Sequence, residues 1–346
     1  MKYKIFSIGI LSMLITLLFQ GCDKIEPGTP VAKPVYDMSG FARGADVSWL
    51  TEMEKSGVKF YDRSGRDSEC ITLLRDLGVN AIRLRVWVDP EDGWCNKGDF
   101  LVKAYRAHNL GMRLMVDFHY SDSWADPGQQ TKPRAWAEYS VDELCDAVGT
   151  HTTDVLSALR EQGIEPEWVQ VGNETGNGML WDEGKADISM ANYARLNNAG
   201  YDAVKTIFPQ SKVIVHLEDG DNMDKFNWLF GGLKANGGKW DVAGMSLYPE
   251  ADTWRSMTTS CLENMRQMIA TYGCDVMVCE VGMAADQPET CKEWLETLMT
   301  GARAIDGCLG VFYWEPQSYA NWKAYGKGAF DDNGMPTVVM DAFSKP

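Results

Sequence analysis

Short apolar runs recur along the chain, and this repetition constrains the fold more than any other feature of the sequence. Each run is rich in β-branched or aromatic residues, ends in polar or aromatic side chains, and is followed by a helix-like stretch. The pattern predicts eight strands, at Phe41–Val47, Ala81–Val88, Arg113–His119, Trp168–Gly172, Lys212–Leu217, Val242–Tyr248, Asp275–Glu280 and Leu309–Trp314.

Amphipathic stretches separate these runs, among them Val141–Gln162, Asn192–Phe208 and Cys261–Tyr272. Runs such as VIVH and VMVCE are apolar without clean alternation, as expected for parallel strands that are covered on both faces. An open doubly wound sheet is the alternative, but no GxGxxG or Walker sequence supports it. We therefore predict an α/β fold, a single (β/α)8 TIM barrel.

The N-terminal segment differs in composition from the rest of the chain. Two lysines precede an apolar run from Ile8 to Phe19, which is too short to cross a bilayer, and Gln-Gly-Cys follows it. This resembles a lipobox, so we predict a lipoprotein signal peptide over residues 1–21 and a lipid on Cys22, with an ordinary signal peptide as the alternative. Residues 22–34 would form a flexible tether and residues 35–346 a single catalytic barrel. We expect an exported lipoprotein, anchored at the outer membrane or the cell surface.

Charge and cysteine content narrow the range of ligands. A formal net charge of −16 opposes binding to nucleic acid or another polyanion and favours a neutral ligand. Beyond Cys22 the chain has eight cysteines, none in CxxC spacing, which argues against a zinc site. Export would permit one or two disulfides, buried thiols are the alternative, and the sequence selects no pairing.

Polar and aromatic side chains follow the predicted strands, where the active site of a (β/α)8 barrel lies. Glu174 ends the fourth strand and Glu280 the seventh, so a closed barrel brings both to its mouth. Such a pair suits glycoside hydrolysis, in which one carboxylic acid protonates the leaving oxygen while the other, ionised, attacks the anomeric carbon. For either residue alone, the alternative is a strand-end carboxylate in a surface salt bridge. The other strand ends supply Arg83, Arg85, Asp117, His119, Asn173, His216, Tyr248, Trp314 and Glu315.

Longer motifs add a family resemblance. FHYSDSWADPGQQTKPRAW (118–136), GADVSW (44–49) and VQVGNETGNGMLW (169–181) resemble glycoside hydrolase family 53. Asn-Glu after the fourth strand with Glu after the seventh is similar to the pattern of the clan A retaining glycosidases. Members of family 53 are endo-β-1,4-galactanases. The resemblance covers essentially the whole chain after Cys22, and it implies that Glu174 is the acid/base, that Glu280 is the nucleophile, and that anomeric configuration is retained.

Several neighbours are candidates to support this pair. Asn173 is expected to hydrogen-bond the 2-hydroxyl of the sugar that is cleaved, a contact that strengthens in the transition state. Tyr248 is expected to donate a hydrogen bond that keeps Glu280 ionised. Arg83 or Arg85 could do the same electrostatically. We expect only one of the two arginines to face inward and, by the resemblance, choose Arg83.

Other side chains are candidates for sugar contacts. His119 is predicted to contact the sugar or Glu280, with a structural histidine as the alternative, and Asp46 to bind a sugar hydroxyl. Trp314 is expected to form the floor under the sugar that is cleaved, because the apolar face of a sugar ring packs on indole. For the remaining tryptophans, core packing is the alternative to a flanking subsite; they are Trp49, Trp87, Trp124, Trp136, Trp181 and Trp322.

The sequence predicts no cofactor and no metal site. Asp219–Asn222 (DGDN) and Asp331–Gly334 (DDNG) invite a structural calcium, but neither completes an EF-hand loop and we interpret both as turns. From the resemblance, the expected partner is neutral β-1,4-galactan, bound by a monomer. The alternatives are another clan A retaining endoglycanase, acting on mannan, xylan or glucan, or a glycan-binding lipoprotein without catalysis.

Overall fold

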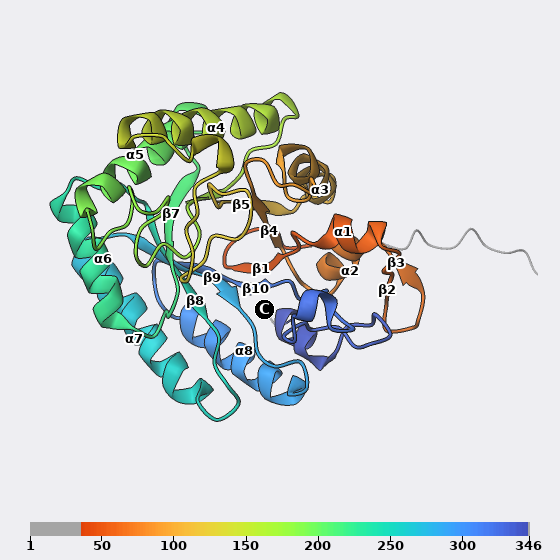
Figure 1. Cartoon of the computed structure of the whole chain (residues 1–346). Coiled ribbons are helices and arrows are strands. Elements are labelled where there is room, and N and C mark those ends of the chain that lie inside the picture. Colours follow the sequence, from red (N-terminus) through yellow and green to blue (C-terminus); the bar gives the residue numbers. More distant parts are fainter. Residues whose placement is uncertain (1–35, 345–346) are drawn as a thin grey trace, which may run out of the picture. The chain divides into compact units, whose positions relative to one another are not determined.

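The computed structural model describes residues 36–344, in which parallel strands close into a barrel (Figure 1). These strands are β1 (Ala42–Asp46), β4 (Ala81–Val86), β5 (Arg113–Phe118), β6 (Trp168–Val171), β7 (Lys212–Leu217), β8 (Val242–Leu247), β9 (Asp275–Val281) and β10 (Cys308–Trp314). Their order around the barrel is β1, β10, β9, β8, β7, β6, β5, β4, and β1 pairs in parallel with both β10 and β4. The predicted (β/α)8 barrel is confirmed, with each predicted strand present.

Helices follow the strands and cover the outside of the barrel (Figure 1). The three predicted helices are confirmed, and each begins at or before the predicted residue. A capping box marks one such start, where the side chains of Ser140 and Glu143 bond each other's backbone N–H groups. The helices are α1 (Leu50–Lys55), α2 (Cys70–Asp76), α3 (Lys97–Asn109), α4 (Val141–Glu161), α5 (Met190–Ile207), α6 (Met223–Ala235), α7 (Trp254–Tyr272) and α8 (Pro288–Arg303).

Smaller elements complete the described chain. A short antiparallel pair, β2 (Phe60–Tyr61) and β3 (Asp67–Ser68), lies between α1 and α2. Three 3₁₀ helices occur in the connections and at the end of the described chain, η1 (Arg134–Trp136), η2 (Trp322–Ala324) and η3 (Val338–Ser344).

The half of the barrel interior that lies nearer the N-terminal ends of the strands, here called the lower half, is an apolar plug. Trp168 on β6 and Phe312 on β10 meet edge to face, with ring centroids 5.9 Å apart. Gly44 on β1 faces the same ring, and a Cβ there would lie 2.0 Å from Phe312 Cδ1, so the tight packing requires glycine. The buried residues of this plug are Ala42, Ala81, Met115, Trp168, Ile214, Val242, Met277, Cys279 and Phe312.

A buried polar layer lies above the plug. Strand side chains alternate with a period of two, so the residue two positions beyond an inward-facing one also faces inward. Ala81, Met115, Trp168 and Ile214 are thus followed by polar side chains that also face into the barrel. The polar residues of this layer are Asp46, Arg83, Asp117, Gln170, His216 and Ser246, each no more than 1% exposed.

Glu280 joins this layer through an irregularity in β9. Met277 and Cys279 already face the interior, so simple alternation would turn Glu280 outward. The register with β8 shifts at this point: Met245 pairs with Val278, but the next residue, Ser246, pairs with Glu280. The extra residue is a β-bulge, which re-aims the following side chain. Glu280 therefore points inward.

The cysteines between residues 36 and 344 all have free thiols, and most are buried. The alternative of buried thiols thus holds for this part of the chain, and the alternative of one or two disulfides does not. The predicted signal peptide, lipidated Cys22 and tether lie outside the described residues. Among the helices of residues 36–344, none combines the length and apolar character that a membrane crossing requires.

Candidate active site

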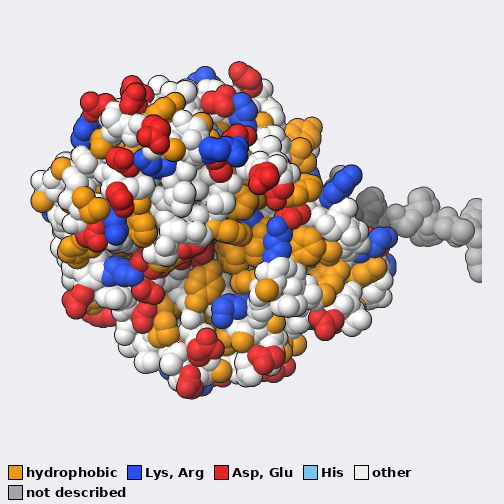
Figure 2. Space-filling model, in the orientation of Figure 1, with side chains coloured by type: hydrophobic (Ala, Val, Ile, Leu, Met, Phe, Trp, Pro, Cys, Tyr) orange, Lys and Arg blue, Asp and Glu red, His pale blue; other side chains and the backbone are white. Residues whose placement is uncertain are grey.

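A cavity of about 410 Å³ opens where the barrel strands end, and Glu174 and Glu280 both border it. Figure 2 shows hydrophobic side chains gathered around the middle of one face, with carboxylates beside them. The two strand-end carboxylates therefore meet at one site. The other predicted residues that border the cavity are Trp49, His119, Trp124, Asn173, Tyr248 and Trp314, and the lining is completed by Ala125, Asp126, Lys323, Ala324 and Tyr325.

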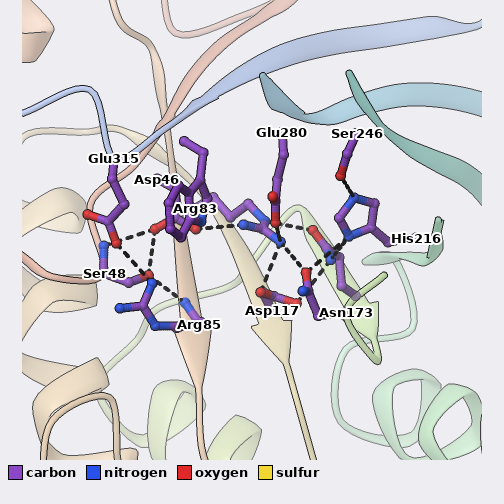
Figure 3. Close-up of polar contacts among 12 residues, drawn as sticks. Asp46, Ser48, Arg83, Arg85, Asp117, Asn173, His216, Ser246, Glu280 and Glu315 are labelled. Atoms are coloured by element: carbon purple, nitrogen blue, oxygen red, sulfur yellow. Dashed lines mark hydrogen bonds and ion pairs between the residues drawn. The ribbon is translucent and has the colours of Figure 1, made fainter. Parts of the chain in front are cut away.

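Arg83 lies beneath the cavity and holds three carboxylates (Figure 3). Its Nη1 is 2.7 Å from Asp46 Oδ2, and its Nη2 is 2.9 Å from Asp117 Oδ2 and 2.8 Å from Glu280 Oε1. The Arg83 side chain is only 1% exposed. Buried charges are costly unless they are paired, so the cation and its carboxylates stabilise one another as a unit. The choice of Arg83 as an inward-facing arginine is confirmed.

The expectation that only one of the two arginines faces inward is wrong. Arg83 and Arg85 are two residues apart, so alternation places both on the same side of β4. Arg85 is equally buried, and its Nη1 lies 2.9 Å from Glu315 Oε1. Its guanidinium also lies 4.4 Å from the ring centroid of Trp124, a cation–π contact. Arg85 thus supports the aromatic wall of the cavity, whereas Arg83 pairs with Glu280.

Glu280 is held by two donors. The Tyr248 hydroxyl donates to Oε2 at 2.8 Å, as predicted, and Arg83 is paired with Oε1. Burial raises the pKa of Glu280 to about 7, and Arg83 and Tyr248 both oppose that rise. The two contacts therefore favour the ionised form of a carboxylate that is otherwise poorly solvated.

Glu174 has a different environment. It directly follows Asn173 after β6 with a φ of 46°, a left-handed conformation that is rare for residues other than glycine. Its Oε1 accepts a hydrogen bond of 2.7 Å from the Ser246 hydroxyl. Burial raises the pKa of Glu174 well above its usual value, and the negative charge of Glu280 raises it further. The cavity thus presents one carboxyl group whose raised pKa has no directly paired cation to oppose it, beside one whose rise is opposed by Arg83 and Tyr248.

Asn173 and His119 are anchored to the loop after β5. Asn173 Nδ2 donates to the carbonyl oxygen of Ala125 at 2.8 Å, and its Oδ1 accepts from Arg83 at 2.9 Å. The Ala125 N–H donates to His119 Nδ1 at 3.1 Å, so His119 Nε2 carries the proton and donates to Asp117 Oδ2 at 3.0 Å. His119 borders the cavity, but its ring nitrogens bond to protein groups other than Glu280.

Asp46 does not take the predicted role. Its side chain is fully buried beneath the cavity. Asp46 Oδ2 pairs with Arg83, and Oδ1 accepts hydrogen bonds from the backbone N–H and the hydroxyl of Ser48 at 2.9 and 2.6 Å. Both oxygens already have partners inside the barrel, so Asp46 stabilises Arg83 and is not exposed to a sugar hydroxyl.

Aromatic rings form one wall of the cavity. The Trp314 ring centroid lies 5.0 Å from that of Trp49, 5.8 Å from that of Trp124 and 4.7 Å from that of Tyr325. These edge-to-face contacts fix the rings relative to one another. Of the predicted tryptophans, Trp49, Trp124 and Trp314 border the cavity, whereas Trp87, Trp136, Trp181 and Trp322 are not among its lining residues.

The two segments that invited a calcium interpretation make local turn and capping contacts. The Asn222 side chain accepts a hydrogen bond from the Lys225 backbone N–H and caps α6. Asp331 Oδ1 accepts from the backbone N–H groups of Asn333 and Met335, at 2.9 and 3.0 Å. These bonds are the side-chain-to-backbone contacts typical of Asx turns and N-caps.

Comparison with known proteins places this site in a family. The sequence profile described as glycosyl hydrolase family 53 matches residues 42–339. This chain belongs to glycosyl hydrolase family 53. A probable arabinogalactan endo-β-1,4-galactanase A from Neosartorya fischeri is 33% identical in an alignment of 318 positions, which covers 84% of this chain and 87% of the relative. An arabinogalactan endo-β-1,4-galactanase from Thermothelomyces thermophilus is 30% identical in an alignment of 299 positions, which covers 79% of this chain and 89% of that enzyme.

Solved structures of a galactanase and of a family 53 catalytic domain have the same fold. A fungal β-1,4-galactanase superimposes with a TM-score of 0.82 at 27% identity, covering 89% of this chain and 100% of the other. A family 53 catalytic domain from Ignisphaera aggregans superimposes with a TM-score of 0.80 at 29% identity, covering 92% of this chain and 97% of that domain.

Several residues of this family 53 site were not predicted from the sequence. Ser246 and Gln170 lie inside strands, away from the strand ends where site residues were sought. For Ser246, its position two residues before Tyr248 was a usable signal. Tyr325 and Lys323 border the cavity from the segment after β10. That segment carries no periodic pattern, so only the fold brings it to the cavity.

The Arg83 cluster generates a stability prediction. We expect Arg83→Met to lower the free energy of unfolding by about 3–5 kcal/mol, because buried carboxylates lose their cation. In the variant, Asp117 and Glu280 should take up protons more readily when folded than when unfolded, so stability should rise as pH falls. Urea unfolding at pH 5 and pH 8 measures both effects. Arg66→Met, which removes an 83% exposed partner of Asp62, is the control and should cost less than about 1 kcal/mol. A penalty for Arg83→Met that is small, or equal at both pH values, would contradict this account.

Proposed function

We propose that this protein is a retaining endo-β-1,4-galactanase in which Glu174 is the acid/base and Glu280 the nucleophile. One observation carries the assignment: the two carboxylates share one cavity but only Glu280 is paired directly with Arg83. The contact favours an ionised Glu280, and burial keeps Glu174 protonated. Family membership and the names of the relatives support galactan as the substrate.

The proposed reaction has two steps. In the first, a Glu280 oxygen attacks the anomeric carbon while Glu174 gives its proton to the leaving glycosidic oxygen, so that a galactosyl ester forms on Glu280. That ester removes the charge beside Glu174, whose pKa falls. In the second step Glu174 accepts a proton from the incoming water, whose oxygen bonds to the anomeric carbon as the bond to Glu280 breaks and frees that carboxylate. One amide N–H of Asn173 donates to the Ala125 carbonyl oxygen. We assign the other N–H as a donor to the 2-hydroxyl of the sugar that is cleaved.

The cavity suits a neutral sugar chain. Trp314, Trp49 and Trp124 offer aromatic surface for the apolar faces of sugar rings. The formal net charge of −16 disfavours anionic polymers. We also propose that the enzyme works as a monomer, because one chain supplies both carboxylates and the aromatic wall beside them.

Product analysis on linear β-1,4-galactan tests the function. Wild-type protein should release short galacto-oligosaccharides whose first-formed reducing ends are β-anomers by ¹H NMR. Glu280→Gln should lower kcat by about 10⁴-fold or more through loss of the nucleophile, and Glu174→Gln by about 10²- to 10⁴-fold. Glu289→Gln, on an exposed part of α8, is the control and should be fully active. Hydrolysis by Glu280→Gln at the wild-type rate, or α-anomers as first products, would refute the proposal.

The Tyr248 hydrogen bond generates a pH prediction. Its donation to Glu280 lowers the pKa of that carboxyl, so Tyr248→Phe should raise it. Because the nucleophile must be ionised, the acidic limb of the kcat/KM profile should move to higher pH, by about one unit. The alkaline limb should stay in place. Tyr105→Phe, on the exposed face of α3, should leave both limbs unchanged. If the acidic limb stays in place in Tyr248→Phe, Tyr248 does not influence the ionisation of Glu280 and the prediction is wrong.

We also propose that the protein is exported and lipid-anchored through Cys22, at the outer membrane or the cell surface. The lipobox-like sequence and the polar residues that follow it support this placement. In a bacterial host the full chain should incorporate labelled palmitate and partition into the detergent phase of Triton X-114. Cys22→Ser should do neither. If Cys22→Ser were labelled to the wild-type level, the lipid could not be attached to Cys22 and the proposal would be wrong.

A further inference from the structure

Three buried side chains connect Arg83 with Glu174. Gln170 on β6, His216 on β7 and Ser246 on β8 face into the barrel, and none is more than 1% exposed. Gln170 Oε1 lies 2.7 Å from Arg83 Nε, and Gln170 Nε2 lies 2.9 Å from His216 Nδ1. His216 Nε2 lies 2.9 Å from Ser246 Oγ (Figure 3), which is 2.7 Å from Glu174 Oε1.

The direction of the first bonds follows from Arg83. A guanidinium can only donate, so Gln170 must turn its oxygen toward Arg83 Nε. The Gln170 amide nitrogen then faces Asp117 Oδ1 at 3.0 Å and His216 Nδ1 at 2.9 Å. Both contacts require it to donate. His216 Nδ1 also lies 3.5 Å from the Glu174 backbone nitrogen, a second donor, and 3.1 Å from Asn173 Oδ1, an acceptor that already receives a hydrogen bond from Arg83. With two donors and one acceptor around it, His216 Nδ1 is assigned as an acceptor.

The direction of the last bonds follows from His216. Burial lowers the pKa of His216 well below its usual value, with Arg83 as the next cause, so the ring is neutral and has a single N–H. Since Nδ1 accepts, that proton is on Nε2 and is donated to Ser246 Oγ. The Ser246 hydroxyl then has its own proton free to donate to Glu174 Oε1.

We propose that Gln170, His216 and Ser246 form a one-way hydrogen-bond chain that reserves Glu174 Oε1 as an acceptor and thereby places the catalytic proton on Oε2. Within residues 36–344, Oε2 has no hydrogen-bond partner, and Glu174 borders the cavity. The inference rests on the proposed role of Glu174 as acid/base. The three side chains are positioning residues, because they act through Glu174.

Charged groups around Glu174 shift its pKa in both directions, and the hydrogen bond from Ser246 acts in addition to them. Glu280 on β9 and Glu218, which follows β7, raise the pKa of Glu174, and Arg83 on β4 lowers it. The charge of Glu218 is itself paired with Lys225, at 2.6 Å. The Ser246 hydrogen bond opposes the two carboxylates, because an accepted hydrogen bond favours the ionised form of Glu174. The bond thus helps Glu174 to ionise for the second step.

The test uses the alkaline limb of the kcat/KM profile on a galacto-oligosaccharide, a limb set by loss of the Glu174 proton. Ser246→Ala should move this limb to higher pH by about one unit. Ser246→Thr, which keeps the hydroxyl, should restore its position. Ser318→Ala removes another buried hydroxyl, one without a hydrogen-bond partner in the described chain, and should leave the limb in place. An alkaline limb that does not move in Ser246→Ala would overturn the proposal.

An activated substrate supplies a readout that a merely structural role would not change. An aryl β-galactobioside with a good leaving group needs no acid in the first step, so its kcat/KM should show no shift of the alkaline limb in Ser246→Ala. A similar shift with both substrates would overturn the proposal. If the wild type hydrolyses neither substrate, the proposed function itself fails, which is a distinguishable result.

A double-mutant cycle tests the chain beyond Ser246. Gln170→Met removes the donor to His216, so it should shift the alkaline limb in the wild-type background. The same substitution should add no further shift in the Ser246→Ala background, because the chain is already broken there. Shifts that add would show that Gln170 acts on Glu174 by another route and would overturn the proposal.

Discussion

The structure of the site depends on one buried cation. Arg83 pairs with Asp46, Asp117 and Glu280 in a region where unpaired charge would be strongly unfavourable. Because a guanidinium is always charged and only donates, it stabilises the ionised form of Glu280 and orients the amide of Gln170. Arg83 therefore favours ionisation of Glu280 over ionisation of Glu174, because it pairs directly with Glu280 only.

The barrel reduces the free-energy cost of these buried charges by separating its interior into an apolar layer and a polar layer. The lower layer is closed by Trp168 and Phe312, which keep the polar layer away from the other end of the barrel. In the upper layer the strands bring polar side chains together at short distances, so their hydrogen bonds and ion pairs are mutually satisfied. The aromatic wall around Trp314 then shields the mouth, which strengthens electrostatic interactions inside.

Much of this could be predicted from the sequence, and the misses have physical causes. The strand runs and the position of Glu174 and Glu280 at strand ends are local patterns, and these predictions agree with the structure. The expectation for Arg85 misapplied strand alternation, which places residues two apart on one side. Asp46 was misplaced because a strand-end carboxylate can point either to the cavity or into the polar layer, and only the neighbouring cation decides between them.

By itself the sequence determined the fold class and the position of Glu174 and Glu280 at strand ends, since periodicity and strand-end chemistry are properties of short segments. Tertiary structure alone decided which way Glu280 points, because the β-bulge depends on how β9 pairs with β8. It also decided which oxygen of Glu174 accepts from Ser246. Hydrogen-bond direction and side-chain facing are set by neighbours that lie far away in the chain, and those neighbours meet only when the barrel closes.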